Sequence, residues 1–169
     1  MNAPLSANNT IVQPVRSKGE IVIRNAKSLL GMPVIADGET LGRVSCVQTD
    51  DTLREIRGLF LSCGLSGTRF VERRQVDLIG DIAVLIHGSG RRMAMDRPPL
   101  LRRAYSPDGR RIGAITDAVI DEKSLLVAAL ELSYGYLDDL TGGRVRVSQF
   151  SVRKNGDVVV EHAEGGNLS

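Results

Sequence analysis

Residues 37–50 read DGETLGRVSCVQTD, and residues 108–121 read DGRRIGAITDAVID. Both segments begin with Asp-Gly, carry a second glycine four residues after the first, and end on an aspartate. The match keeps a constant offset of 71, and it runs without a gap to Ser62 and Ser133. Seven of the 26 pairs are identical: Asp37/Asp108, Gly38/Gly109, Gly42/Gly113, Asp50/Asp121, Leu59/Leu130, Leu61/Leu132 and Ser62/Ser133. Self-similarity at a fixed offset indicates two copies of one module.

The pattern within each copy predicts β-structure. Short runs rich in β-branched residues lie between polar or glycine-containing breaks, with apolar positions near a period of two. In the first copy we expect strands at 34–36, 41–49, 56–63, 69–72 and 82–86. The second copy repeats them at 112–120, 125–132, 144–147 and 158–161, and Gly80-Asp81-Ile82 recurs as Gly156-Asp157-Val158. Helix is limited to single turns at 26–30 and 72–76.

Four glycines are predicted to shape the backbone. Gly38 and Gly109 follow an aspartate in a tight turn between strands. Gly42 and Gly113 lie inside a strand pattern, where glycine usually marks a bulge or a sharp bend. The resulting fold class is all-β: two small β-barrels in tandem with very little helix. The expected division is a tail at 1–25 that can add one strand, a first domain at 26–88, a basic linker at 89–98, a second domain at 99–163 and a frayed end at 164–169.

Composition narrows the function classes. The 169 residues carry 22 Lys and Arg against 20 Asp and Glu, three Tyr, three Phe and no Trp. So few aromatic residues argue against a surface that stacks bases. No apolar run approaches the roughly 20 residues of a membrane helix, and residues 1–18 lack a signal-peptide pattern. We therefore expect a cytoplasmic location.

The entry into the first copy resembles that of the PRC-barrel domain family. Leu29-Leu30-Gly31-Met32-Pro33-Val34, the acidic-Gly turn at 37–38 and Gly42-Arg43-Val44 before Asp50 follow that family's pattern. The closing run from Val76 to Val84 looks like its last strand pair. The second copy keeps the turn and the later glycine but departs at residues 99–105. The resemblance, which covers most of the chain, implies a small β-barrel that serves as an interaction module, as in the H subunit of photosynthetic reaction centres and a factor for 16S rRNA processing.

No catalytic or metal-binding constellation is predicted, and neither is a cofactor. His87 and His162 are single histidines at matching strand ends, and the sequence allows no nucleophile–base pair to be assembled around them. Asp50-Asp51 and Asp121-Glu122 are predicted to cap turns; a bound calcium ion is the alternative, although the spacing is not that of an EF-hand loop. Cys46 and Cys63 are expected to be free thiols near strands, with a disulfide or redox switch as the alternative.

Charge is unevenly distributed along the chain. Between residues 91 and 111 there are seven arginines against two aspartates. These candidate interaction residues are Arg91, Arg92, Arg97, Arg102, Arg103, Arg110 and Arg111. They can form one edge that binds an anionic protein surface, RNA or phospholipid head groups, or they can be solvated arginines on a linker.

Three hypotheses for function follow. The first is a non-enzymatic adaptor or scaffold that acts through protein–protein interaction, with association of identical copies left open. The second is a ribosome- or RNA-associated maturation factor that uses the arginine-rich edge. The third is a hydrolase or ligand-binding barrel, which predicts a polar pocket.

Overall fold

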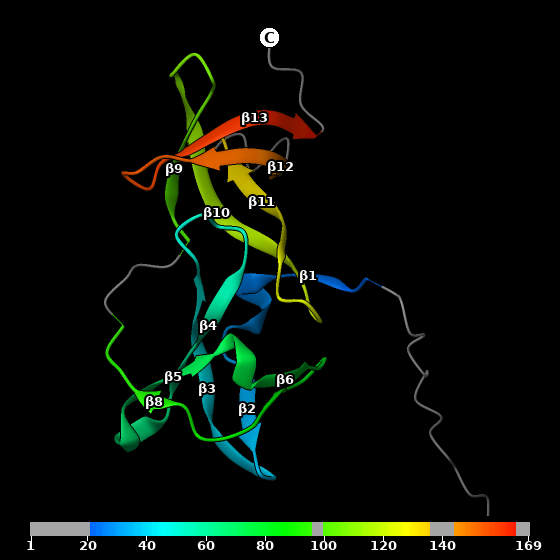
Figure 1. Cartoon of the computed structure of the whole chain (residues 1–169), viewed down its shortest axis with the longest axis vertical. Helices are drawn as coiled ribbons and strands as arrows, with labels where there is room; N and C mark the ends of the chain where they lie inside the picture. The colour runs from blue at the N-terminus through cyan, green and yellow to red at the C-terminus, as the bar shows by residue number, and fades with distance from the viewer. Residues whose placement is uncertain (1–20, 96–99, 136–143, 165–169) are drawn as a thin grey trace, which may run out of the picture.

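The computed structural model describes residues 21–95, 100–135 and 144–164 of the 169. Within these ranges the chain is all-β, as the sequence predicts, and its helical segments are the single turns η1 (Ala26–Leu29), η2 (Gly64–Ser66) and η3 (Arg73–Gln75). No helix in this part of the chain is long and apolar enough to cross a membrane. The strands of the second copy gather at one end of the molecule and those of the first copy at the other (Figure 1).

The second copy is a closed barrel of five strands. They are β9 (Arg102–Tyr105), β10 (Arg111–Asp121), β11 (Val127–Ser133), β12 (Val145–Val152) and β13 (Val158–Glu164). Neighbours pair antiparallel from β9 to β13, and β13 closes the barrel by pairing parallel with β9. Residues 145–147 of β12 pair with β11, and β13 pairs with Arg146 and with residues 149–152.

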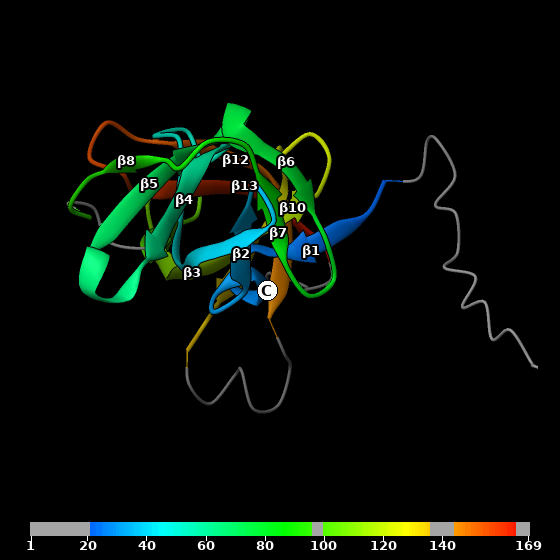
Figure 2. The same ribbon diagram turned by 90° about the horizontal axis from the view of Figure 1, so that it is seen from below.

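The first copy follows the same strand order but forms a curled half-barrel (Figure 2). Its strands are β2 (Pro33–Ala36), β3 (Glu39–Thr49), β4 (Ile56–Ser62), β5 (Thr68–Glu72), β6 (Val76–Ile79), β7 (Val84–Ile86) and β8 (Arg91–Arg92). β5 pairs with β4, and β6 pairs with β7. Together they correspond to β12, and the ladder is interrupted between them because η3 breaks the strand.

The repeat is visible in the strand irregularities. The register of β3 against β4 shifts at Ser45, and that of β10 against β11 shifts at Thr116, which is its counterpart at the same offset. Bulges also occur one residue before Gly42 and before Gly113. These bulges confirm the prediction made for both glycines, and Gly38 and Gly109 have the positive φ angles of tight turns.

The predicted match of Gly80-Asp81-Ile82 with Gly156-Asp157-Val158 is wrong. Val84 and Val158 are the equivalent residues, because their parallel partners Val34 and Ala104 lie opposite Gly42 and Gly113. Ile82 therefore belongs to the turn before β7, where it is 84% exposed, and is not the counterpart of the fully buried Val158. The Gly-Asp-apolar tripeptide occurs in both copies, but when the copies are matched by strand pairing its two occurrences are displaced by two residues.

The two copies join around an approximate twofold axis. Glu55 and Leu126, which differ by the same offset, form an antiparallel bridge. Around it the Ile56 N–H donates to Leu125 O at 2.9 Å, and the Val127 N–H donates to Arg54 O at 2.8 Å. One hydrophobic core continues through both copies, so each small module gains burial that it could not reach alone.

The N-terminal segment adds the strand that the sequence allows, but to the other copy. β1 (Ile23–Asn25) pairs antiparallel with residues 119–121 of β10, and η1 follows before the chain enters β2. The rest of the predicted tail (1–20), Arg97, residues 136–143 and the end from 165 lie outside the described residues.

Candidate interaction site between the two copies

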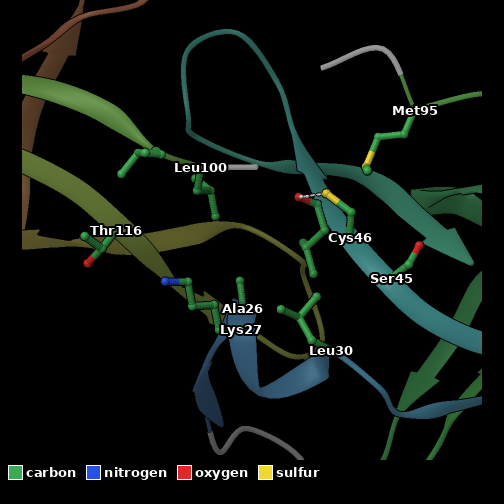
Figure 3. A pocket seen from close by; sticks show the side chains of 10 residues that line it. Ala26, Lys27, Leu30, Ser45, Cys46, Met95, Leu100 and Thr116 are labelled. Atoms are coloured by element: carbon green, nitrogen blue, oxygen red, sulfur yellow. Dashed lines mark hydrogen bonds between the residues drawn. The ribbon is translucent and has the colours of Figure 1, made fainter. Parts of the chain in front are cut away.

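A pocket of about 360 Å³ lies between the two copies. Its walls come from four separate segments of the chain: η1 and the residue after it, the bulge of β3, the residues around the linker, and β10 (Figure 3). The lining residues are Ala26, Lys27, Leu30, Ser45, Cys46, Val47, Met95, Leu100, Leu101 and Thr116. Most of these side chains are apolar, unlike the polar pocket that the hydrolase hypothesis predicts.

The pocket follows the approximate twofold relation between the copies. Ser45 and Thr116 are equivalent by the repeat offset, and both line the pocket. Strand pairing makes Val34 equivalent to Ala104, so Leu30 corresponds to Leu100, which also lines the pocket. Ser45 and Thr116 are the bulge residues of β3 and β10, and their hydroxyls lie 3.0 Å from Phe60 O and 3.5 Å from Glu131 O. Equivalent parts of the two copies therefore form opposite walls of one site.

β1 and η1 are held against the second copy by acidic residues. The Arg24 guanidinium lies 2.5 Å from the Glu122 carboxylate, and the Asn25 side-chain amide donates to Glu131 at 2.7 Å. The Lys27 backbone N–H donates to Asp117 Oδ1 at 3.1 Å. These contacts fix η1, so they also fix Lys27 and Leu30 at the pocket.

The corresponding face of the first copy is apolar. Cys46, Phe60 and Phe70 form a small buried cluster on which Met93 packs. Their counterparts in the second copy, by offset and strand pairing, are Asp117, Glu131 and Arg146. Each face thus receives a chain segment of matching chemistry: methionine on the apolar face, and polar groups of β1 and η1 on the charged face.

Cys46 and Cys63 form no disulfide with each other. Burial raises the pKa of the Cys46 thiol, which favours the neutral, unreactive form. In this structure both thiols are free.

Asp117 is buried, and it occupies the position in the second copy that Cys46 occupies in the first. Burial raises the pKa of the Asp117 carboxyl, and the nearby Glu131 carboxylate raises it further; the N–H groups of Ala118 and Lys27 act in the opposite direction. Because the folded-state pKa lies above the unfolded value, the native chain binds more protons than the unfolded chain at pH values between these two pKa values. The stability that Asp117 contributes is therefore present below the unfolded pKa and decreases as pH rises through the folded pKa.

We expect Asp117→Asn to stabilise the protein more at pH 7 than at pH 4, since asparagine can accept the same two N–H bonds without ionising. Urea unfolding of the wild type and the variant at both pH values measures this difference. Asp117→Ala is the control: it leaves two buried N–H groups without their acceptor and should destabilise by about 1–3 kcal/mol. An equal effect of Asp117→Asn at both pH values would contradict the assignment.

The predicted arginine edge is divided in the structure. Arg91 and Arg92 form β8 at the edge of the first sheet, and the Arg91 guanidinium lies 5.7 Å from the centre of the Phe70 ring. Arg102, Arg103, Arg110 and Arg111 lie on the β9–β10 hairpin of the second copy. Arg97 is not among the described residues.

Arg102 of this hairpin acquires two basic neighbours that sequence reasoning missed. Arg153 and Lys154, in the turn between β12 and β13, line a concavity together with Arg102. The Arg153 guanidinium also lies 5.3 Å from the centre of the Tyr105 ring. The parallel pairing of β13 with β9 brings these residues together, and a local sequence pattern contains no sign of that pairing.

The predicted turn aspartates have the role expected of them. The Asp50 carboxylate accepts N–H bonds from Thr52, Arg54 and Glu55, and the Asp121 carboxylate accepts bonds from Lys123 and Ser124. His87 Nδ1 lies 2.7 Å from the Asp77 carboxylate at an exposed position. The backbone of His162 belongs to β13, and its side chain is outside the description. Among the described side chains, no group of three metal-ligating residues gathers.

Comparison with known proteins leaves this chain without an assigned family. No family model matches the sequence, and no similar curated protein is found. The resemblance to PRC-barrel domains therefore remains a prediction.

Proposed function

We propose that this protein is a non-enzymatic adaptor that binds a protein partner at the pocket between its two copies. The observation that carries this proposal is the apolar pocket of about 360 Å³ with an exposed apolar margin. Leu30, Met95 and Leu101 are 46%, 47% and 66% exposed, and they stand together at this site. Apolar side chains grouped around a cavity are typical of protein-binding surfaces.

Three further points support an adaptor. The pocket is built from both copies, so the whole chain presents one binding surface. Its walls are held from behind by the shared core and by the contacts of η1, which gives a preorganised site. The resemblance to PRC-barrel domains points to the same class of function, acting in the cytoplasm.

An RNA- or ribosome-associated role is the second candidate. The observation that favours it is the concavity that Arg102 of the β9–β10 hairpin lines together with Arg153 and Lys154, where Arg153 lies over the Tyr105 ring. Clustered guanidinium groups beside an aromatic ring suit a phosphate backbone. The aromatic content of the whole chain is low, so we rank this role below protein binding.

Affinity capture with the full chain from its native cell separates these roles. The pocket variant carries Leu30→Asp and Leu101→Asp, and Leu65→Asp is the matched control because Leu65 is fully exposed in η2, outside this pocket. We expect the pocket variant to capture at least about tenfold less of a protein partner than the control does, as is usual for substitutions at the centre of an interface.

A third variant, Arg103→Glu with Arg110→Glu, tests the basic hairpin. For an adaptor, this variant keeps the protein partner. Retention of the partner by the pocket variant, together with nuclease-sensitive capture of RNA that only the arginine variant loses, would reject the adaptor and support the second candidate.

A further inference from the structure

The size of the pocket limits what can enter it. A volume of about 360 Å³ lies near the lower end of the range of roughly 300–1,000 Å³ found for ligand pockets. The pocket can therefore take one or two large aliphatic side chains, whereas a helix or a folded loop would have to remain outside.

The margin of the pocket favours a peptide over a free aliphatic molecule. Leu30, Met95 and Leu101 expose apolar surface beside the cavity. A fatty acid that filled the cavity would leave this surface in water. A polypeptide segment crossing the site would cover it and gain the free energy of that additional burial.

One charge accompanies this apolar surface. Lys27 is the ionised side chain among the described residues that line the pocket, and none of those residues carries a carboxylate. Figure 3 shows its amino group extending toward the Thr116 side of the cavity. Lys27 also interacts electrostatically with Asp117, but that carboxylate is buried and accepts backbone N–H bonds from Lys27 and Ala118. The exposed ammonium thus remains accessible to a ligand at the pocket.

The position of Lys27 is set by the fold. Its backbone N–H is bound to Asp117, and the preceding Asn25 and Arg24 are bound to Glu131 and Glu122. The ammonium therefore extends from an anchored helical turn. The hydroxyls of Ser45 and Thr116 stand on the two walls and can bond to the main chain of a ligand.

From this arrangement we propose that the pocket selects a peptide segment in which one or two leucine-like side chains directly adjoin a carboxylate. The aliphatic side chains fill the cavity, and the carboxylate pairs with Lys27. The proposal rests on the adaptor function and adds the chemistry of the partner segment to it. Charge complementarity at the rim then contributes selectivity more than affinity.

Three capped peptides test the proposal by amide NMR titration of the labelled full chain. They are Gly-Ser-Leu-Leu-Glu-Glu-Ser-Gly, the same sequence with lysines in place of the glutamates, and the same sequence with serines in place of the leucines. We expect the first to shift the amides of Lys27, Ser45 and Thr116 and to bind at least about fivefold more tightly than the second. The third should leave these amides unchanged.

Lys27→Glu should reverse the preference between the acidic and basic peptides, and Lys27→Gln should abolish it. Both changes leave the backbone N–H bond to Asp117 in place, so the fold should survive, which circular dichroism checks. Equal binding of the two charged peptides would overturn the proposal, while a partner captured through Leu30 and Leu101 would leave the adaptor function intact. The proposal would also be overturned, in favour of a fatty-acid ligand, if dodecanoate bound the pocket more tightly than the acidic peptide and displaced it.

Discussion

Replacing Gly113 by alanine should lower the free energy of unfolding by about 3 kcal/mol, near the upper end of the usual cost of overpacking. An alanine Cβ at this position would stand 2.1 Å from Ser133 O, an atom of the neighbouring strand. The clash is with backbone, so no side-chain rotation relieves it, and β10 and β11 would have to move apart. Chemical denaturation measures the loss.

A graded series provides the control. At Gly42, the equivalent position, the nearest atom would be Ser62 O at 2.6 Å, and at Gly80 it would be Ala83 O at 3.1 Å. The destabilisation by alanine should therefore decrease in the order Gly113, Gly42, Gly80. A Gly113→Ala variant as stable as the wild type would show that β10 and β11 do not approach as described.

Leu130→Ala should destabilise the protein by about 2–5 kcal/mol, the usual cost of removing a fully buried leucine side chain. Its counterpart in the first copy, Leu59, is similarly buried and should give a similar loss. Both residues belong to the single core that runs through the two copies. We therefore expect either substitution to weaken the whole molecule.

The measurement is thermal unfolding followed at resolved amide signals in each copy. Signals of β4 and β11 should lose intensity at the same temperature in the wild type and in both variants, because the Glu55–Leu126 bridge and the shared core couple the copies. Two separate transitions, with only the mutated copy shifted, would contradict a single cooperative unit.

The difference between the two copies illustrates why a repeat does not imply two identical surfaces. The cluster of Cys46, Phe60 and Phe70 and the set of Asp117, Glu131 and Arg146 occupy matching positions. The two sets differ in polarity because each must match a different covering segment. Divergence at these positions therefore follows from packing between distant parts of the chain.

The sequence pattern does not predict the candidate site. Its leucines and hydroxyls belong to four segments that meet only when the copies pack around the twofold axis. The repeat offset links Ser45 with Thr116 in the sequence, but it does not say that the two residues line the same pocket. Similarly, the arginine count between 91 and 111 predicts one edge, whereas strand pairing places Arg91 and Arg92 on the first sheet and the hairpin arginines on the second.

The sequence by itself determined the β class, the two copies, the tight turns at Asp37-Gly38 and Asp108-Gly109, and the irregular backbone at Gly42 and Gly113. These features depend on local backbone preferences and on a constant spacing, both of which are readable along a single chain. Only the tertiary structure decided that η3 interrupts the first barrel, that β1 pairs with the second copy, and that a pocket forms between the copies. These outcomes depend on which distant surfaces bury each other, and a periodic pattern specifies which face is buried but not what covers it.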